Sequence, residues 1–169
     1  GLIERGIEEG AGVVAGGQEA MSASPHYLFG LRNGIKAGNQ TMLDGMIHDG
    51  LWDSFGDNHM GVYAEYTAAK AGVSRADQDR FAFESHQRAI AATQAGRFKD
   101  EIVPLQITRA DNSTDTHHID EGIRFDASLD GIKGVKLIAE NGKHTAASAS
   151  QICDGASGVM VVNERGLKS

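Results

Sequence analysis

The pattern of apolar and polar residues predicts strands near both ends of the chain and helices between them. Residues 11–17 and 158–162 are wholly apolar, which is typical of strands buried inside the sheet of an α/β protein. Residues 2–7 carry apolar side chains at helical spacing and predict a short helix that ends at Gly10. The two apolar runs have the character of strands taken from a larger sheet.

The first helical pattern of the middle region follows a polar loop and ends at Gly72. Asn58 is suited to the N-cap position, and Gly72 to the left-handed position after the last turn. His59 and Met60 therefore lie in the predicted first turn, where free N–H groups and the helix dipole favour anions and polarised carbonyls. This pair is suited to line a ligand channel, and packing of the helix start on a core is the alternative interpretation.

A second and longer helix is predicted over residues 74–95. Ser74 and Asp77 have the spacing of a capping box, and Gly96 is placed to close the helix. Small residues form a stripe along one side of it: Ala82, Ser85, Ala89 and Ala92. We expect this helix to be a scaffold for other elements.

An ordered loop and a short helical segment precede these helices. Residues 21–38 are rich in Ser, Gly and Asn, and Leu28, Phe29 and Leu31 lie among them. Apolar residues at a loop tip commonly form an interface, and packing against their own domain is the alternative. Residues 42–47 predict a short helical segment before a glycine.

Shorter elements are predicted beyond the long helix. Residues 103–107 alternate as a half-buried strand, which Pro104 confines to an edge or a bulge. Residues 108–122 are predicted to be a polar, acidic loop. A short helix is expected within residues 129–137, and Asn-Gly at residues 141–142 is a strong turn signal.

The composition is that of a globular chain and excludes two classes of partner. Of 169 residues, 40% are hydrophobic and 23% are charged, as in an ordinary folded domain. The net charge of −7 argues against nucleic acid, which is bound by clustered Lys and Arg. No apolar run approaches the roughly 20 residues that span a bilayer. The single cysteine, Cys153, cannot form an internal disulfide, which fits a reducing compartment.

The acidic loop contains an adjacent histidine pair, His117 and His118. Neighbouring side chains of an extended chain point to opposite sides, so this pair makes a poor chelate. We predict no metal site, and an acidic His/Asp metal-binding protein is the alternative interpretation.

The segment of residues 145–157 is built mainly from small side chains, which let a ligand or another backbone approach closely. Ser150 offers both a hydrogen-bond donor and an acceptor. Cys153 lies in the same segment, and nothing near it in the sequence would activate it as a nucleophile. We therefore expect Cys153 to be a small, partly buried residue.

Several of these motifs occur in the order that is found in one family. The matching motifs are Ala15-Gly16-Gly17-Gln18-Glu19-Ala20-Met21-Ser22, Asp49-Gly50-Leu51, His59-Met60-Gly61 with Ala64-Glu65, Ser74-Arg75 with Gln78-Asp79, residues 96–104 and residues 145–156. The chain resembles the central part of a thiolase, an acetyl-CoA C-acyltransferase, over nearly its whole length. The resemblance implies an α/β, thiolase-like fold. Residues 1–21 would end the N-terminal domain, residues 22–152 would be an inserted coenzyme A-binding loop domain, and residues 153–169 would return to the N-terminal domain.

The resemblance also implies a binding site for coenzyme A. His59 and Met60 match a motif that borders the acyl and pantetheine pocket. Arg124 matches an arginine that approaches the nucleotide end of coenzyme A. Ser150 matches a serine that hydrogen-bonds the pantetheine chain, with Ala146 beside it.

Two segments depart from the family pattern. Ser148 stands where asparagine is common, and residues 135–142 lack the usual Leu-Arg/Lys-Pro-x-Phe. Some degradative thiolases lack a histidine at the position of His59, so its presence favours short-chain substrates.

Thiolases work through a cysteine thiolate that takes the acyl group, and acid/base residues serve the Claisen step. The resemblance places the nucleophile before this segment and the other catalytic residues after it, so no residue here is predicted to be catalytic. It implies coenzyme A or acyl-CoA as substrate and no permanently bound cofactor. It also implies a homo-oligomer, a dimer or tetramer, that associates through residues 24–38. We expect a cytoplasmic segment of a thiolase, and a non-catalytic acyl-CoA-binding or oligomerisation module is the alternative.

Overall fold

The computed structural model describes residues 12–168, which form two compact units. Within the described chain, the first unit consists of residues 12–50 and 152–168, and the second of Leu51–Gln151. The helix predicted within residues 2–10 lies outside the described residues. The units meet after Gly50 and after Gln151. The predicted inserted domain, residues 22–152, stays a prediction.

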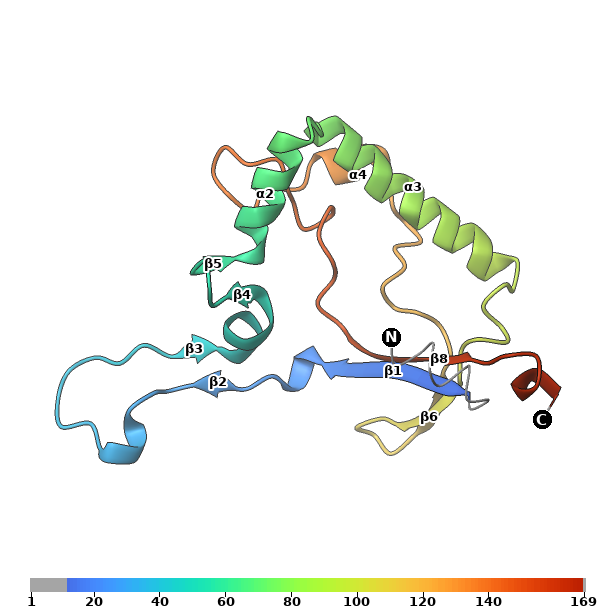
Figure 1. Cartoon of the computed structure of the whole chain (residues 1–169), viewed down its shortest axis with the longest axis horizontal. Coiled ribbons are helices and arrows are strands. Elements are labelled where there is room, and N and C mark those ends of the chain that lie inside the picture. The colour runs from blue at the N-terminus through green and yellow to red at the C-terminus, as the bar shows by residue number, and fades with distance from the viewer. Residues whose placement is uncertain (1–11, 169) are drawn as a thin grey trace. The chain divides into compact units, whose positions relative to one another are not determined.

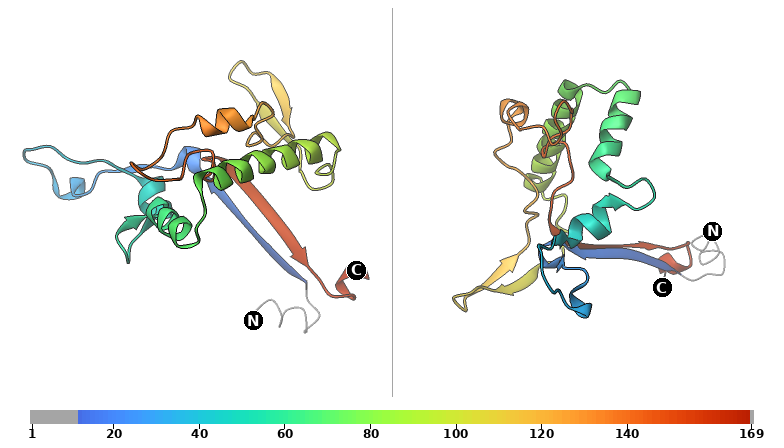
Figure 2. Two further views of the ribbon diagram at one scale, coloured as in Figure 1. Left: turned by 90° about the horizontal axis from the view of Figure 1, so that it is seen from above. Right: turned by 90° about the vertical axis from the view of Figure 1, so that its left-hand side faces the viewer.

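The first unit contains a long antiparallel ribbon made from both ends of the described chain (Figures 1 and 2). Strand β1, Val13–Ala20, pairs with β8, Asp154–Val161, in a register that runs from Val13 opposite Val161 to Ala20 opposite Asp154. The two predicted apolar strands are thus confirmed. Their predicted burial is wrong within the described chain, because a two-stranded ribbon leaves both faces uncovered, and nearly all of its residues are exposed.

Between β1 and residue 50, the first unit consists of short elements joined by loops. They are 3₁₀ turns at Met21–Ala23 and Leu31–Asn33, strands β2 (His26–Tyr27) and β3 (Leu43–Asp44), and a π-helical turn at Met46–Leu51 that ends in the second unit. The Tyr27 hydroxyl donates to the Asp49 carboxylate at 2.5 Å, and the His48 ring lies 2.7 Å from the other Asp49 oxygen. The loop is ordered as predicted, whereas the short helical segment lies at Met46–Leu51, later than the predicted residues 42–47, of which Leu43–Asp44 form a strand. Leu28, Phe29 and Leu31 are exposed.

The second unit contains the helices. Its elements are β4 (Trp52–Asp53), β5 (Asn58–His59), α2 (Met60–Lys70), α3 (Arg75–Gln94), β6 (Leu105–Thr108), β7 (Thr114–His117) and α4 (Leu129–Lys133). Within the described residues, the buried apolar side chains are few: Ala68, Ala82 and Ile132, one from each helix. The helices are therefore fixed largely by the polar contacts described below.

The ends of α2 differ from expectation at one position. His59, and not Asn58, is the N-cap: its ring Nδ1 accepts the Gly61 N–H at 2.9 Å. Asn58 is paired with Asp53 in the β4–β5 hairpin, and its side chain donates to the Gly56 carbonyl at 2.5 Å. At the other end Gly72 has a left-handed φ of +68°, as predicted.

Helix α3 has the predicted ends. The Ser74 hydroxyl accepts the Asp77 N–H at 3.1 Å, and the Asp77 carboxylate accepts the Ser74 N–H at 3.3 Å, which completes the capping box. Gly96, with a φ of +68°, closes the helix. Arg88 pairs with Glu84 at 3.3 Å on its exposed side.

Beyond α3, the polar loop predicted at residues 108–122 contains a strand. Strand β7 pairs antiparallel with β6 across a turn in which Asn112 has a φ of +63°. All four β6 residues are exposed, so the half-buried character predicted for this strand is wrong within the described chain. The short helix and the Asn-Gly turn are confirmed: α4 forms, and the Gly142 N–H donates to the Ala139 carbonyl at 3.0 Å.

Candidate functional site

A groove of about 1290 Å³ lies within the second unit. Three segments far apart in the sequence line it: the first half of α3, residues 124–135 with α4, and residues 144–151. Its volume exceeds the roughly 300–1,000 Å³ of sites for small molecules, so it suits an extended ligand. Arg124, Ala146 and Ser150, three of the five predicted site residues, lie in its wall.

Arg124 offers an unpaired cation to this groove. Its backbone N–H donates to Nδ1 of His86 on α3 at 3.3 Å, which ties the loop to the helix. The guanidinium is exposed, and within the described chain it has no hydrogen bond or ion pair. Guanidinium groups bind phosphate and carboxylate in a bidentate manner, so Arg124 is suited to an anionic part of a ligand.

The segment of residues 145–150 forms a tight turn in another part of the groove lining. Thr145 is fully buried, and its N–H donates to the Ser148 hydroxyl at 3.0 Å. The Ser148 N–H donates back to the Thr145 carbonyl at 3.1 Å. Ala146 and Ser150 are exposed, and the Ser150 hydroxyl has no partner in the described chain, so it can donate to or accept from a ligand.

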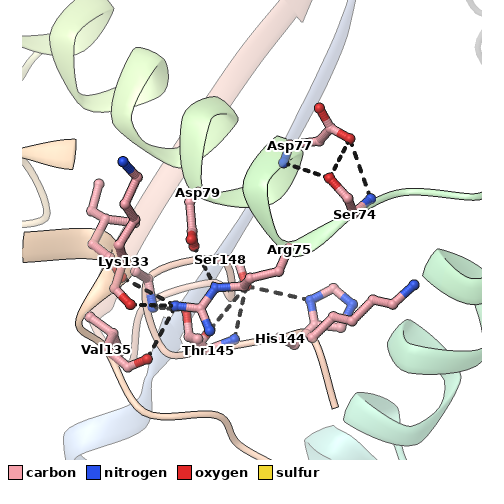
Figure 3. Close-up of polar contacts among 12 residues, drawn as sticks. Ser74, Arg75, Asp77, Asp79, Lys133, Val135, His144, Thr145 and Ser148 are labelled. Atoms are coloured by element: carbon pink, nitrogen blue, oxygen red, sulfur yellow. Dashed lines mark hydrogen bonds and ion pairs between the residues drawn. The ribbon is translucent and has the colours of Figure 1, made fainter. Parts of the chain in front are cut away.

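Arg75 fixes α4 to the start of α3 (Figure 3). Its Nε donates to the Asp79 carboxylate at 2.7 Å, and Asp79 is only 4% exposed. Its Nη2 donates to the carbonyls of Ile132, Lys133 and Val135 at 3.4, 3.1 and 3.2 Å. A cation at the carboxyl end of α4 also complements the helix dipole. Arg75 therefore ties the carboxyl end of α4 to the start of α3.

His59 and Met60 lie in the same unit but do not line the groove. Because Nδ1 of His59 accepts a backbone N–H, the neutral ring carries its proton on Nε2 and can donate it to a carbonyl oxygen. The preceding hairpin is braced by Tyr63, whose hydroxyl donates to Asp53 at 2.8 Å. This hydrogen bond holds the pKa of the Asp53 carboxyl below its usual range and raises the pKa of Tyr63. Met60 is exposed.

Sequence reasoning missed three polar residues of the groove wall. His86 anchors the Arg124 loop, as described above. The Gln78 amide and Nε2 of His144 are buried and have no hydrogen-bond partner within the described chain. Gln78 and His86 are eight residues apart on α3, so helical periodicity places them on the same side of the helix, about two turns apart. This spacing is the signal that could have identified these two residues.

Cys153 lies outside this groove and is exposed, so the expectation of partial burial is wrong. It lies directly before β8, and its backbone N–H donates to the Met21 sulfur at 3.4 Å. Among residues 12–168, no cluster of three or more His, Cys, Asp or Glu could hold a metal ion. None of the helices in this part of the chain is long and apolar enough to cross a membrane.

Comparison with known proteins assigns the chain to a class. The family model "Thiolase, N-terminal domain" matches residues 6–165. The chain is 45% identical over 152 residues to the acetyl-CoA acetyltransferase of Chromobacterium violaceum, a match that covers 89% of this chain and 39% of the relative. It is 47% identical over 153 residues to a probable acetyl-CoA acetyltransferase of Escherichia coli, covering 90% of this chain and 39% of the relative.

Solved structures agree with this assignment. Human mitochondrial 3-ketoacyl-CoA thiolase superposes with a TM-score of 0.84 at 30% identity, covering 98% of this chain and 42% of that one. Its complex with CoA gives a TM-score of 0.83, also at 30% identity, covering 98% and 41%. The fold is therefore the α/β thiolase fold. The chain belongs to the thiolase family, and it spans about two-fifths of the length of the curated relatives it matches.

Proposed function

We propose that the whole protein is an acyltransferase that moves acyl groups between coenzyme A and an enzyme cysteine. The reaction would be 3-ketoacyl-CoA thiolysis or acetyl-CoA condensation, and this chain would supply the acyl-CoA-binding region. The observation that supports it best is the groove of the second unit. There an unpaired guanidinium, Arg124, and a free hydroxyl, Ser150, reach one large groove from separate segments.

Each predicted site residue suits a different part of one ligand. Arg124 would pair with the phosphates at the nucleotide end, and Ser150 would hydrogen-bond an amide of the pantetheine chain, with Ala146 leaving room for it. His59 and Met60 would meet the acyl end, where Nε2–H of the ring donates to the thioester carbonyl and the methionine packs on apolar atoms. We propose no permanently bound cofactor.

Affinity measurements on the whole protein test this assignment. Arg124→Ala should weaken coenzyme A binding by about 1–2 kcal/mol, and Ser150→Ala by about 0.5–1.5 kcal/mol. Met60→Ala should change the preference among acyl groups more than the affinity for free coenzyme A. Arg88→Ala, an exposed arginine of α3 outside the groove, is the matched control and should leave the affinity unchanged.

Calorimetric titration with coenzyme A and acetyl-CoA gives these affinities, and thiolysis of a short-chain 3-ketoacyl-CoA gives the activity. Equal affinities for the wild type, Arg124→Ala and Ser150→Ala would place the ligand elsewhere. Binding without thiolysis in the whole protein would favour the alternative of a non-catalytic acyl-CoA-binding module.

We also propose that the whole protein associates with itself through residues 24–38. Leu28, Phe29 and Leu31 are 38%, 59% and 57% exposed, and large exposed apolar side chains on one loop favour an interface. The observation favours a homo-oligomer, a dimer or tetramer, and sedimentation of the whole protein measures it.

An exposed free cysteine suits a reducing compartment, so we propose a cytoplasmic location.

A further inference from the structure

Glu65 lies on α2, five residues after Met60, and reaches the loop that leads into the groove wall. One carboxylate oxygen accepts the N–H groups of Lys143 and His144, each at 2.8 Å. The other accepts the same Lys143 N–H at 2.9 Å. Burial alone would raise the pKa of this carboxyl, but the backbone hydrogen bonds and the neighbouring positive charges outweigh it, so the pKa lies below its usual range.

The loop is shaped to receive this carboxylate. A Cβ added to Gly142 would lie 2.4 Å from the nearer Glu65 oxygen and 3.1 Å from the Ala139 carbonyl oxygen, so the carboxylate or the loop would have to shift. Gly142 does not have a left-handed φ, so the backbone conformation does not require glycine here. The missing side chain instead leaves room for the Glu65 carboxylate to approach the loop. The Lys143 ammonium, in the same loop, also donates a hydrogen bond to the Val73 carbonyl at 3.3 Å.

We infer that Glu65 is a positioning residue that couples the acyl end of the ligand site to its coenzyme A end. The helix that carries Glu65 starts with His59 and Met60. The loop that it holds continues directly into the groove wall that carries Ala146 and Ser150. A carboxylate that fixes two consecutive backbone N–H groups sets both the place and the direction of the segment that follows. This inference rests on the proposed function, because it assigns the two ends of one ligand to these two elements.

A double-mutant cycle in the whole protein tests the inference. Glu65→Ala removes the acceptor, and Gly142→Ala forces the Glu65 carboxylate and the loop apart. Each should raise the Kd for coenzyme A and the KM for acetyl-CoA by about tenfold, with kcat changed less than about twofold. The double variant should be no worse than either single variant, because both changes break one contact. Glu101→Ala, which removes an exposed carboxylate outside the groove, is the matched control and should leave Kd and KM unchanged.

Amide hydrogen exchange supplies a readout that does not depend on the ligand. Exchange of the amides of residues 143–150 should accelerate in Glu65→Ala, while that of the α3 amides stays unchanged. Wild-type affinity retained in both single variants, or additive losses in the double variant, would overturn the inference. If the wild type does not bind coenzyme A, the proposed function fails. In that case exchange alone decides whether Glu65 positions this segment, and unchanged exchange overturns it.

Discussion

Replacing Arg75 by alanine should destabilise the second unit through two losses at once. The buried Asp79 carboxylate would lose its only described partner, at 2.7 Å, and the end of α4 would lose a donor shared among three carbonyls. The Arg75 side chain is 26% exposed and Asp79 4%, so water replaces little of this contact. Breaking a buried ion pair from one side costs about 3–5 kcal/mol, and the partial exposure of Arg75 argues for the lower end, about 3 kcal/mol.

The double variant Arg75→Ala/Asp79→Ala separates the two losses. Removing the stranded carboxylate should recover about 1–2 kcal/mol, and the remainder is the value of the α4 contacts. Denaturant unfolding of the whole protein measures the free energies, and hydrogen exchange of the Ile132 and Val135 amides shows whether α4 loosens. Arg88→Ala removes an exposed pair on the same helix and should cost no more than about 0.5 kcal/mol. If Arg75→Ala lowers the free energy of unfolding by no more than Arg88→Ala does, the reasoning is refuted.

Two further predictions concern the start of α3 and the cysteine. Ser74→Ala should cost about 1 kcal/mol of unfolding free energy. The Ser74 hydroxyl holds the pKa of the Asp77 carboxyl below its usual range. The stability that the ionised carboxylate contributes is therefore fully present above about pH 3.9 and is lost as the pH falls through the lower, folded-state value. The difference between wild type and variant should shrink on acidification to about pH 3, and a constant difference would contradict this. Cys153→Ser should leave turnover of the whole protein unchanged, whereas lost turnover would make Cys153 the nucleophile.

Features encoded by neighbouring residues could be predicted from the sequence. The capping box of Ser74 and Asp77 and the left-handed positions of Gly72 and Gly96 depend on contacts within one turn of helix. The error at Asn58 has a non-local cause. This residue pairs across a hairpin, so its side chain is engaged elsewhere and the next residue caps the helix.

Strand β7 was missed because its sequence, Thr-Asp-Thr-His, carries no apolar alternation. Its strand conformation comes from pairing with β6, and both strands are largely exposed, so burial leaves no period-two pattern to detect. The predicted burial of β1 and β8 failed for the converse reason. Their apolar residues indicate a covered sheet, and the described chain provides only the two strands.

Apart from the i,i+4 pair of Arg75 and Asp79, the contacts that hold the groove leave no residue pair to recognise in the sequence. Arg75 and Glu65 are charged side chains, but most of their partners are backbone carbonyls and N–H groups, which every residue type provides. The partner segments can therefore change side chains and still be held in place. Ser148 illustrates this freedom: it stands where the family commonly has asparagine, and its hydroxyl closes the turn with Thr145. A groove that is fixed through its backbone can thus vary the residues of its lining while keeping its shape.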